Sequence, residues 1–383
     1  MSYQILSNID LPNIRINKSN TDLLKKLIVL IKESKKHFNS NKSSIQVNKQ
    51  IMQNEIIQTI PNFSYYPSAI QTHILNINTK MNFQFNLLLN GHSFNCNIIT
   101  EKDFSEKNIM NTYIQFIYYW LYIATKVCNK KCSDTMNIYL FAISLEKQLP
   151  DYASILSQNN CNTAFTTSCM INTDLHLFRK EEWFKVFIHE TFHNLGLDFS
   201  GIDKISNTIL QNTFSIKDDI RAYESYTEIY AEMIMVLFLC SEKSNAQDEI
   251  IRLWKQEMRL EQQFSIFQAG KILKYYNLDY SDLLKKENST VKYTEHTQVF
   301  SYYLLKLILM YHINDFLDWS NNNNKHIIQF KQTEQNIVSF CDFIIKKHNN
   351  PSLISYIDQA KQLVKKNNTK IMNTLRMTIH NFP

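Results

Sequence analysis

The chain contains little glycine and little proline. Only four of its 383 residues are glycine, and six are proline. So few glycines exclude a glycine-rich phosphate-binding loop and a dinucleotide-binding fingerprint, because both need several glycines at short spacing. The same scarcity, combined with abundant Asn, Lys and Ile, suggests an AT-rich genome.

Strong charge and long apolar runs are also missing. The net charge of +6 is mild and does not indicate a nucleic-acid-binding protein. The longest apolar stretches, 113–127 and 302–314, are short or interrupted by Lys306, so we expect no membrane span. The first residues lack a basic region followed by an apolar run, which predicts no signal peptide and an intracellular protein.

Seven cysteines are scattered along the chain. Cys128 and Cys132 have the spacing of one helical turn, but no second pair completes a metal site of the zinc-ribbon kind. An odd number of cysteines in an intracellular protein favours reduced thiols.

Hydrophobic periodicity divides the chain into a mixed part and a helical part. Residues 81–100 alternate with a period of two around Asn90-Gly91, which predicts a β-hairpin. A helix at 107–127 and strands at 136–144, 161–168 and 171–179 follow, leading to a helix at 180–195 that Gly196 would end. The other helices are expected at 18–38, 47–60, 217–241, 246–277, 293–318, 326–348 and 352–380.

These elements predict an α+β fold in three regions. Residues 1–78 form a helical N-terminal region, residues 79–241 form the core with the strands, and residues 242–383 form a helical C-terminal region. Asn321 to Asn324 are expected to link two of the C-terminal helices. No internal repeat is evident.

The most informative pattern lies in the helix predicted at 180–195. His189, Glu190 and His193 form the pattern His-Glu-x-x-His. Residues four apart project from one face of a helix, so the two imidazoles supply half of a tetrahedral zinc site. Glu190 is placed to act as the base for a metal-bound water. This pattern is the zinc-binding helix of metallopeptidases, and its uncharged neighbours are typical of a buried helix.

Two histidines and a water leave one zinc ligand to be found. In some proteins with this pattern, the third ligand is a histidine six residues after the second. Here that position is Phe199, which excludes such a ligand. Asp198 lies close and is a minor candidate for this ligand, although it is one residue short of the usual Asp position. A later helix carries Glu224, Glu228 and Glu232 at intervals of four, on one face. Buried carboxylates at this spacing repel one another unless a cation offsets the repulsion, whereas a solvated acidic stripe needs no cation.

The stretch Glu228-Ile-Tyr-Ala-Glu232, together with the His pair, resembles the gluzincins, zinc peptidases whose third ligand is a helical glutamate. The resemblance covers roughly residues 136–240. It implies a zincin-like core with Zn²⁺ bound by His189, His193 and Glu228. Glu232 would then be the partner of a zinc-bound histidine. An alternative register makes Glu224 the ligand, with Glu228 behind it.

The segment preceding His189 is also similar to metallopeptidases of giant nucleocytoplasmic DNA viruses, in agreement with the AT-rich composition. The resemblance implies hydrolysis of a peptide bond in which Glu190 takes a proton from water and passes it to the leaving amine. The oxyanion donor is expected among Tyr226, Tyr223 and His296. The predicted strand 161–168 would offer its edge to an extended substrate.

The sequence therefore predicts a zinc endopeptidase that acts on a protein or peptide, in the host cytoplasm or the virion if the protein is viral. Two other hypotheses stay open. The first is a non-catalytic structural or virion-associated protein that keeps a zincin fold, although such a site needs no base at Glu190. The second is a toxin-like protease acting on host signalling proteins, which the missing secretion signal disfavours. Oligomeric state does not follow from the sequence.

Overall fold

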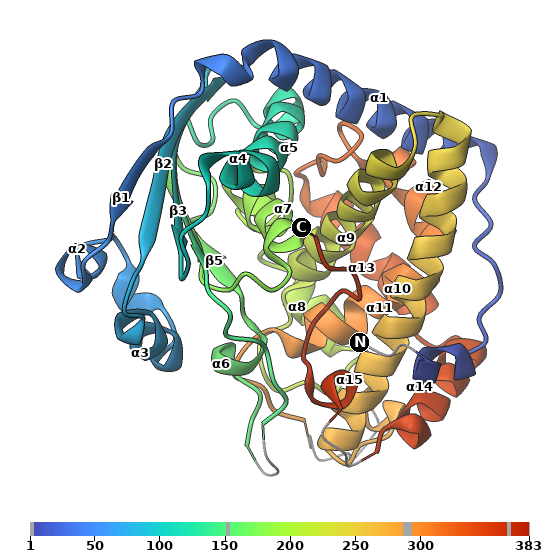
Figure 1. Ribbon diagram of the computed structural model, residues 1–383. Helices are drawn as coiled ribbons and strands as arrows, with labels where there is room; N and C mark the ends of the chain where they lie inside the picture. Colours follow the sequence, from blue (N-terminus) through green and yellow to red (C-terminus); the bar gives the residue numbers. More distant parts are fainter. Residues whose placement is uncertain (1–3, 151–153, 286–292, 366–368, 383) are drawn as a thin grey trace. The chain divides into compact units, whose positions relative to one another are not determined.

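The computed structural model describes residues 4–150, 154–285, 293–365 and 369–382. The chain is an α+β protein with one six-stranded mixed sheet (Figure 1). It divides into two compact units that are each built from separate stretches of the chain. The sheet unit comprises residues 26–146, 162–201 and 381–383, and the helical unit comprises residues 1–25, 147–161 and 202–380.

The sheet has the strand order β1-β2-β3-β4-β6-β5. Its strands are β1 (Asn48–Ile51), β2 (Met81–Leu89), β3 (His92–Thr100), β4 (Thr135–Ala142), β5 (Ala164–Thr166) and β6 (Asn172–Leu177). Strands β3, β4 and β6 are parallel neighbours, while β1, β2 and β5 pair antiparallel. The short strand β5 pairs only with β6 and forms one edge of the sheet.

The predicted hairpin is confirmed. Strands β2 and β3 pair in register from Met81↔Thr100 to Leu89↔His92. Asn90 and Gly91 connect them with positive φ angles of 50° and 89°. A two-residue hairpin turn with φ above zero at both positions follows the twist of the strands, and Asn-Gly is the preferred sequence for it.

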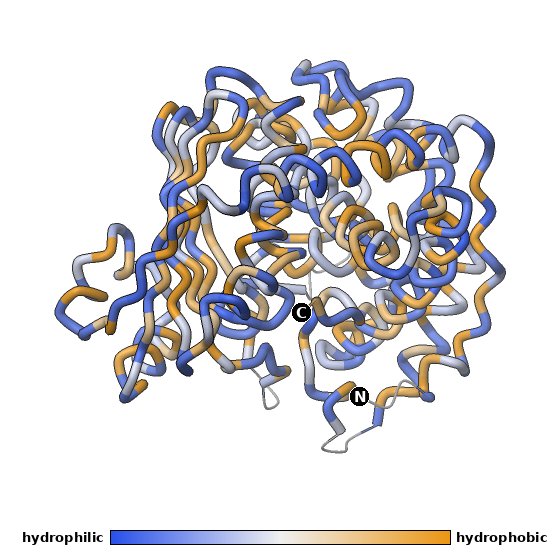
Figure 2. Tube along the Cα trace, turned by 45° about the horizontal axis from the view of Figure 1, so that its top comes forward, coloured by the Kyte–Doolittle hydropathy of each residue, from blue (hydrophilic) through white to orange (hydrophobic). Residues whose placement is uncertain are grey.

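Helices pack on both faces of the sheet (Figure 1). One face contacts α5 (Gln115–Val127) and α7 (Trp183–Asn194). The other meets α2 (Asn54–Gln58) and α3 (Ser68–Asn76), whose Ile57, Ile70 and Ile74 form a buried cluster with side chains of the sheet. The strands alternate between hydrophobic and hydrophilic residues (Figure 2), as expected when the two faces bury different amounts of surface.

The rest of the sheet unit includes short helices and part of one long helix. A turn of π-helix at Met110–Ile114 joins α4 (Glu106–Ile109) to α5. The long helix α1 (Lys18–Asn41) runs from one unit's residues into the other's. Phe382 also belongs to this unit, since its ring lies 4.5 Å from that of Phe116 and 4.4 Å from that of Phe184.

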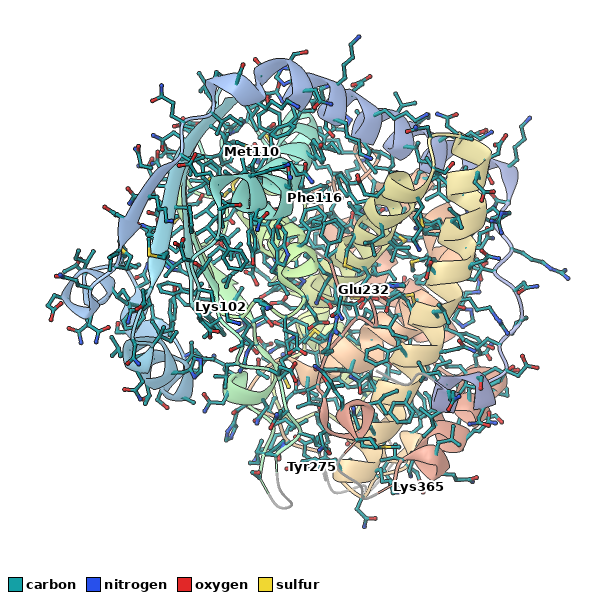
Figure 3. All side chains as sticks on the ribbon, in the orientation of Figure 1. Lys102, Met110, Phe116, Glu232, Tyr275 and Lys365 are labelled. Atoms are coloured by element: carbon teal, nitrogen blue, oxygen red, sulfur yellow. A yellow bond between two sulfur atoms is a disulfide. The ribbon has the colours of Figure 1, made fainter. Side chains whose placement is uncertain are left out.

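The helical unit is built around two long, largely buried helices, α9 (Ala222–Lys243) and α10 (Gln247–Tyr275). Its other helices are α6 (Gln158–Cys161), α8 (Ser206–Gln211), α11 (Lys306–Tyr311), α12 (Ile313–Asn323), α13 (Glu334–Lys347), α14 (Pro351–Leu363) and α15 (Lys370–Asn373). A π-helical segment, Phe300–Leu305, leads into α11. Glu232 of α9 lies among the interior side chains of this unit (Figure 3).

Several predicted elements were wrong in detail. The helix expected at 47–60 is instead β1 followed by α2. The strand expected at 161–168 begins only at Ala164, after α6. The linker expected at Asn321 to Asn324 is mostly the last turn of α12. The helix expected at 352–380 ends at Leu363, and among the described residues after it the short α15 is the one further helix.

Two of the cysteines form a disulfide, Cys132–Cys169. The expectation of reduced thiols is therefore wrong for this pair. Cys96, Cys128 and Cys240 are buried thiols. Within the described ranges, no helix is long and apolar enough to cross a membrane. The division at residues 78 and 241 stays a prediction.

Candidate metal centre

The His-Glu-x-x-His pattern lies on α7, as predicted. Every residue from Trp183 to Asn194 is buried. Trp120 of α5 holds the middle of the helix: its indole N–H donates to the Thr191 hydroxyl at 2.6 Å, and its ring stacks on Phe192. His189, Glu190 and His193 retain 5%, 8% and 8% of their surface exposed, so α7 presents them in an interior, fixed position.

The helix ends where the sequence predicted. Gly196 adopts φ +60°, the left-handed conformation that a residue with a side chain rarely adopts. Its N–H donates to the carbonyl of His193, and the N–H of Leu197 donates to that of Phe192. These two bonds form a Schellman-type cap. The cap reverses the chain, so that Asp198 returns toward the last turn of α7.

Asp198 binds one ring nitrogen of His193. The distance from Nδ1 of His193 to Oδ2 of Asp198 is 2.6 Å, and Ser200 donates to the other carboxylate oxygen at 3.0 Å. Asp198 itself is 1% exposed. A carboxylate at Nδ1 places the ring proton there and leaves the Nε2 lone pair available. The sequence had suggested Asp198 only as a ligand and did not show this contact.

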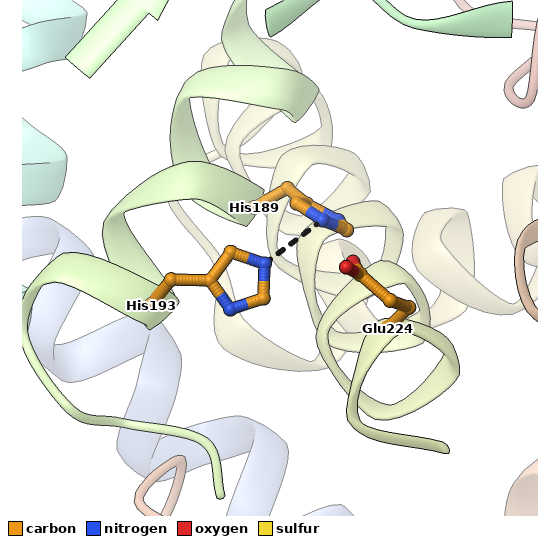
Figure 4. Close-up of side chains that lie close together, drawn as sticks. All are labelled: His189, His193 and Glu224. Atoms are coloured by element: carbon orange, nitrogen blue, oxygen red, sulfur yellow. Dashed lines mark hydrogen bonds between the residues drawn. The ribbon is translucent and has the colours of Figure 1, made fainter. Parts of the chain in front are cut away.

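The two histidines point their Nε2 atoms toward each other. The Nε2–Nε2 distance is 3.3 Å (Figure 4). Two nitrogens bound to one zinc at about 2.05 Å and at the tetrahedral angle would lie about 3.3 Å apart. The pair therefore has the spacing that a tetrahedral zinc ion requires of two ligands.

Glu224 completes the group of ligand-type side chains that lie close together. One ligand atom each from His189, His193 and Glu224 lies within 4.8 Å of the others (Figure 4). Two histidines and a carboxylate form a donor set that suits catalytic zinc. Glu228 and Glu232 are not part of this group, and the predicted roles of Glu228 as ligand and Glu232 as its partner stay predictions.

The glutamates of α9 are buried, which rules out a solvated acidic stripe. Glu224, Glu228 and Glu232 are 7%, 1% and 0% exposed. Glu232 forms a buried ion pair with Lys306, whose Nζ lies 2.7 Å from Oε1. The same ammonium group donates to Ser265 at 2.8 Å and to the carbonyl of Met377 at 3.3 Å. Burial without compensation would be costly for each of these charges.

The predicted oxyanion donors lie in different surroundings. The hydroxyl of Tyr226 donates to Asn324 at 3.1 Å, and its ring packs against those of Tyr230 and Phe330. His296 is exposed, and its backbone N–H donates to the carbonyl of Leu156. Tyr223 is partly buried, and the roles of all three residues stay predictions.

Comparison with known proteins found no matching family model, and neither a curated protein nor a solved structure is significantly similar to this chain.

Proposed function

We propose that this protein is a zinc-dependent endopeptidase with a zincin-like core. The observation that carries the proposal is the 3.3 Å separation of the two Nε2 atoms on α7, which equals the ligand spacing expected around tetrahedral zinc. The Asp198 contact adds support, because zinc-bound histidines commonly donate their other ring N–H to a carboxylate.

The third ligand is proposed to be a glutamate of α9. Glu224 is the first candidate because it groups with the His pair. Glu228 is the second candidate, on the resemblance to gluzincins. Ligand atoms around one zinc lie about 3.3 Å apart, and those of this group lie within 4.8 Å of one another.

Zinc would lower the pKa of a bound water and polarise the substrate carbonyl. Glu190 would take a proton from the attacking water and return it to the leaving amine. Asp198 fixes the orientation and tautomer of His193 during this cycle. Strand β5 stands at the end of the strand order and pairs with β6, so it is the strand to which an extended peptide would add, as in β-strand addition.

Metal analysis of the full chain tests the first half of the proposal. Purified protein should hold one zinc per chain, and His189→Ala should hold none. The matched control is His326→Ala, which changes an exposed histidine and should keep the metal. Zinc-free wild type after incubation with zinc would refute the proposal.

Peptide cleavage tests the second half. Wild-type protein should cleave members of a peptide library in the presence of zinc, while a chelator should abolish the activity. A protein that binds one zinc through His189 but cleaves no peptide would favour the alternative, a non-catalytic protein that keeps a zincin-like core.

A further inference from the structure

The disulfide joins two loops at the same end of the sheet. Cys132 follows α5 and is fully buried, whereas Cys169 precedes β6 and is partly exposed. The neighbours of Cys169, Ser168 and Met170, are exposed. Of the two cysteines, Cys169 is therefore the one that a small thiol in solution can approach.

Both sulfur atoms lie against the turn that ends α7. A Cβ atom built on Gly196 would lie 2.9 Å from Sγ of Cys132 and 3.6 Å from Sγ of Cys169. Gly196 is the left-handed residue between His193 and Asp198. The disulfide thus packs against the turn that brings Asp198 back to His193.

The loops that carry the cysteines also bind the end of α7 through hydrogen bonds. Ser133, next to Cys132, donates its hydroxyl to the carbonyl of Asn194 at 2.8 Å. Asn129 donates its backbone N–H to the carbonyl of Leu195 at 3.1 Å. From the other loop, the carbonyl of Thr167 accepts a hydrogen bond of 2.7 Å from the side-chain amide of Asn194. The first two bonds satisfy carbonyls at the helix terminus that have no partner within the helix, and the third holds the side chain of Asn194.

The backbone of Ser133 adopts a left-handed conformation, which opposes formation of these contacts between the loops and α7. It has φ +56°, which costs a residue with a side chain some conformational energy. Two hydrogen bonds hold this conformation. The backbone N–H of Ser133 donates to the carbonyl of Met170, and Nδ1 of His92 donates to the carbonyl of Ser133. The disulfide keeps the Cys132 and Cys169 loops together, so that these contacts persist.

We infer that Cys132–Cys169 is a reversible thiol–disulfide site that holds the turn between His193 and Asp198 and thereby sets the affinity for the metal. The inference rests on the proposed function. The reactant is a small thiol or dithiol. Its thiolate attacks Sγ of Cys169, the S–S bond breaks, and the electron pair leaves on Sγ of Cys132, which takes a proton from solvent. A second thiolate then attacks the reductant's sulfur and releases Cys169.

The balance of this exchange is simple. Two reductant thiols are oxidised to one disulfide, and the two cysteines become thiols. Reduction removes the covalent link between the two loops and leaves only their hydrogen bonds, such as that from Ser133 to Met170, so the sulfur atoms pack less firmly against Gly196 and Asp198 holds His193 less firmly. Loss of a group that orients a metal ligand typically lowers metal affinity by about 10–100-fold.

Zinc affinity in the two redox states tests the inference. Wild-type protein is compared before and after treatment with a phosphine reductant, and thiol alkylation with mass measurement verifies the state of the cysteines. We expect zinc binding to weaken about 10–100-fold after reduction. Cys169→Ala cannot form this disulfide. It should bind zinc as weakly as the reduced wild type, and the phosphine should not change its zinc affinity. Equal affinity of oxidised and reduced wild type would overturn the inference.

Hydrogen exchange of the metal-free protein separates this inference from the proposed function. The backbone amides of Gly196 and Leu197 should exchange faster after reduction, while amides in the middle of α10 should not change. If even the oxidised protein binds no zinc, the proposed function fails. Hydrogen exchange at Gly196 and Leu197 then tests by itself whether the disulfide is coupled to the turn. Unchanged exchange there would overturn the coupling between the disulfide and the turn, and faster exchange would support it.

Discussion

Oδ2 of Asp198 lies 2.6 Å from Nδ1 of His193, and both side chains are buried. The contact joins the last turn of α7 to the residues that follow it. It assigns the ring proton of His193 to Nδ1, so that Nε2 is left as an acceptor facing His189. The carboxylate is therefore part of what makes His193 suitable as a metal ligand.

Removing this carboxylate should weaken metal binding without abolishing it. We expect Asp198→Ala to lower zinc affinity by about 10–100-fold, measured by competition with a chromophoric chelator. Asp198→Asn should cost less, because its amide oxygen still accepts the Nδ1 proton. Ser200→Ala, which removes only the hydroxyl that binds Asp198, should have the smallest effect. Wild-type affinity in Asp198→Ala would contradict the assigned role.

Glu190 is predicted to act on the proton of the attacking water and not on the metal. Glu190→Gln should therefore keep one zinc per chain and lose peptide hydrolysis by about 10²–10⁴-fold, the range typical of a lost general base. The control is Glu334→Gln, which changes an exposed residue at the start of α13 and should keep full activity. Undiminished hydrolysis by Glu190→Gln would remove Glu190 as the base.

The three glutamates of α9 should differ in their effect on zinc. Alanine substitution of the ligand should abolish tight binding, whereas substitution of a residue that only orients a ligand should cost about 10–100-fold. The proximity of Glu224 to the His pair predicts the largest loss in Glu224→Ala. The resemblance to gluzincins predicts it in Glu228→Ala. Isothermal titration with zinc distinguishes the two registers.

Glu232→Ala serves as the reference in this series. Its carboxylate forms an ion pair with Lys306, so its removal leaves a buried ammonium group and should destabilise the fold by about 3–5 kcal/mol. Thermal unfolding of each variant is therefore measured beside zinc affinity. If none of the three substitutions weakens zinc binding, the third ligand lies outside α9.

Stability of the sheet unit should fall in acid because of His176. Its ring stacks between those of Tyr139 and Phe165, and burial lowers the pKa of His176 to about 4, against a smaller opposing effect of Asp174. The unfolded chain binds the proton near pH 6.5. The stabilisation is thus complete above about pH 6.5 and is lost as pH falls toward 4, by about 3 kcal/mol.

Urea unfolding at about pH 7 and about pH 4 measures this loss. His176→Leu removes the titrating group, so the difference between the two pH values should shrink by about 3 kcal/mol. His326→Ala, at an exposed position, should keep the wild-type difference. An unchanged pH dependence in His176→Leu would show that His176 does not titrate in this way.

Local patterns predicted the parts of the fold that local interactions determine. The hairpin of β2 and β3 follows from alternation around Asn90-Gly91, and α7 follows from its apolar residues and from Gly196. Strand β1 did not follow, because its polar sequence becomes a strand only by pairing with β2. Residues 374–380 did not follow either: Gln268 of α10 and Tyr303 bind the backbone of this segment, and these contacts replace helical hydrogen bonds.

The candidate site shows the same division. The spacing of His189, Glu190 and His193 is a property of one helix and was predictable. Glutamates at intervals of four on α9 are equivalent in sequence, so their register toward the histidines depends on tertiary structure. The Asp198 contact depends on the left-handed turn at Gly196, which the sequence indicated only as the end of a helix.

Phe382 gives the sheet unit an unusual order of assembly. Its ring packs against those of Phe116 and Phe184, which leave the ribosome roughly 270 and roughly 200 residues earlier, respectively. At about 5–20 residues per second, α5 and α7 wait on the order of ten seconds or longer for this side chain. During synthesis the aromatic cluster of the two helices therefore stays incomplete until Phe382 has been added to the chain.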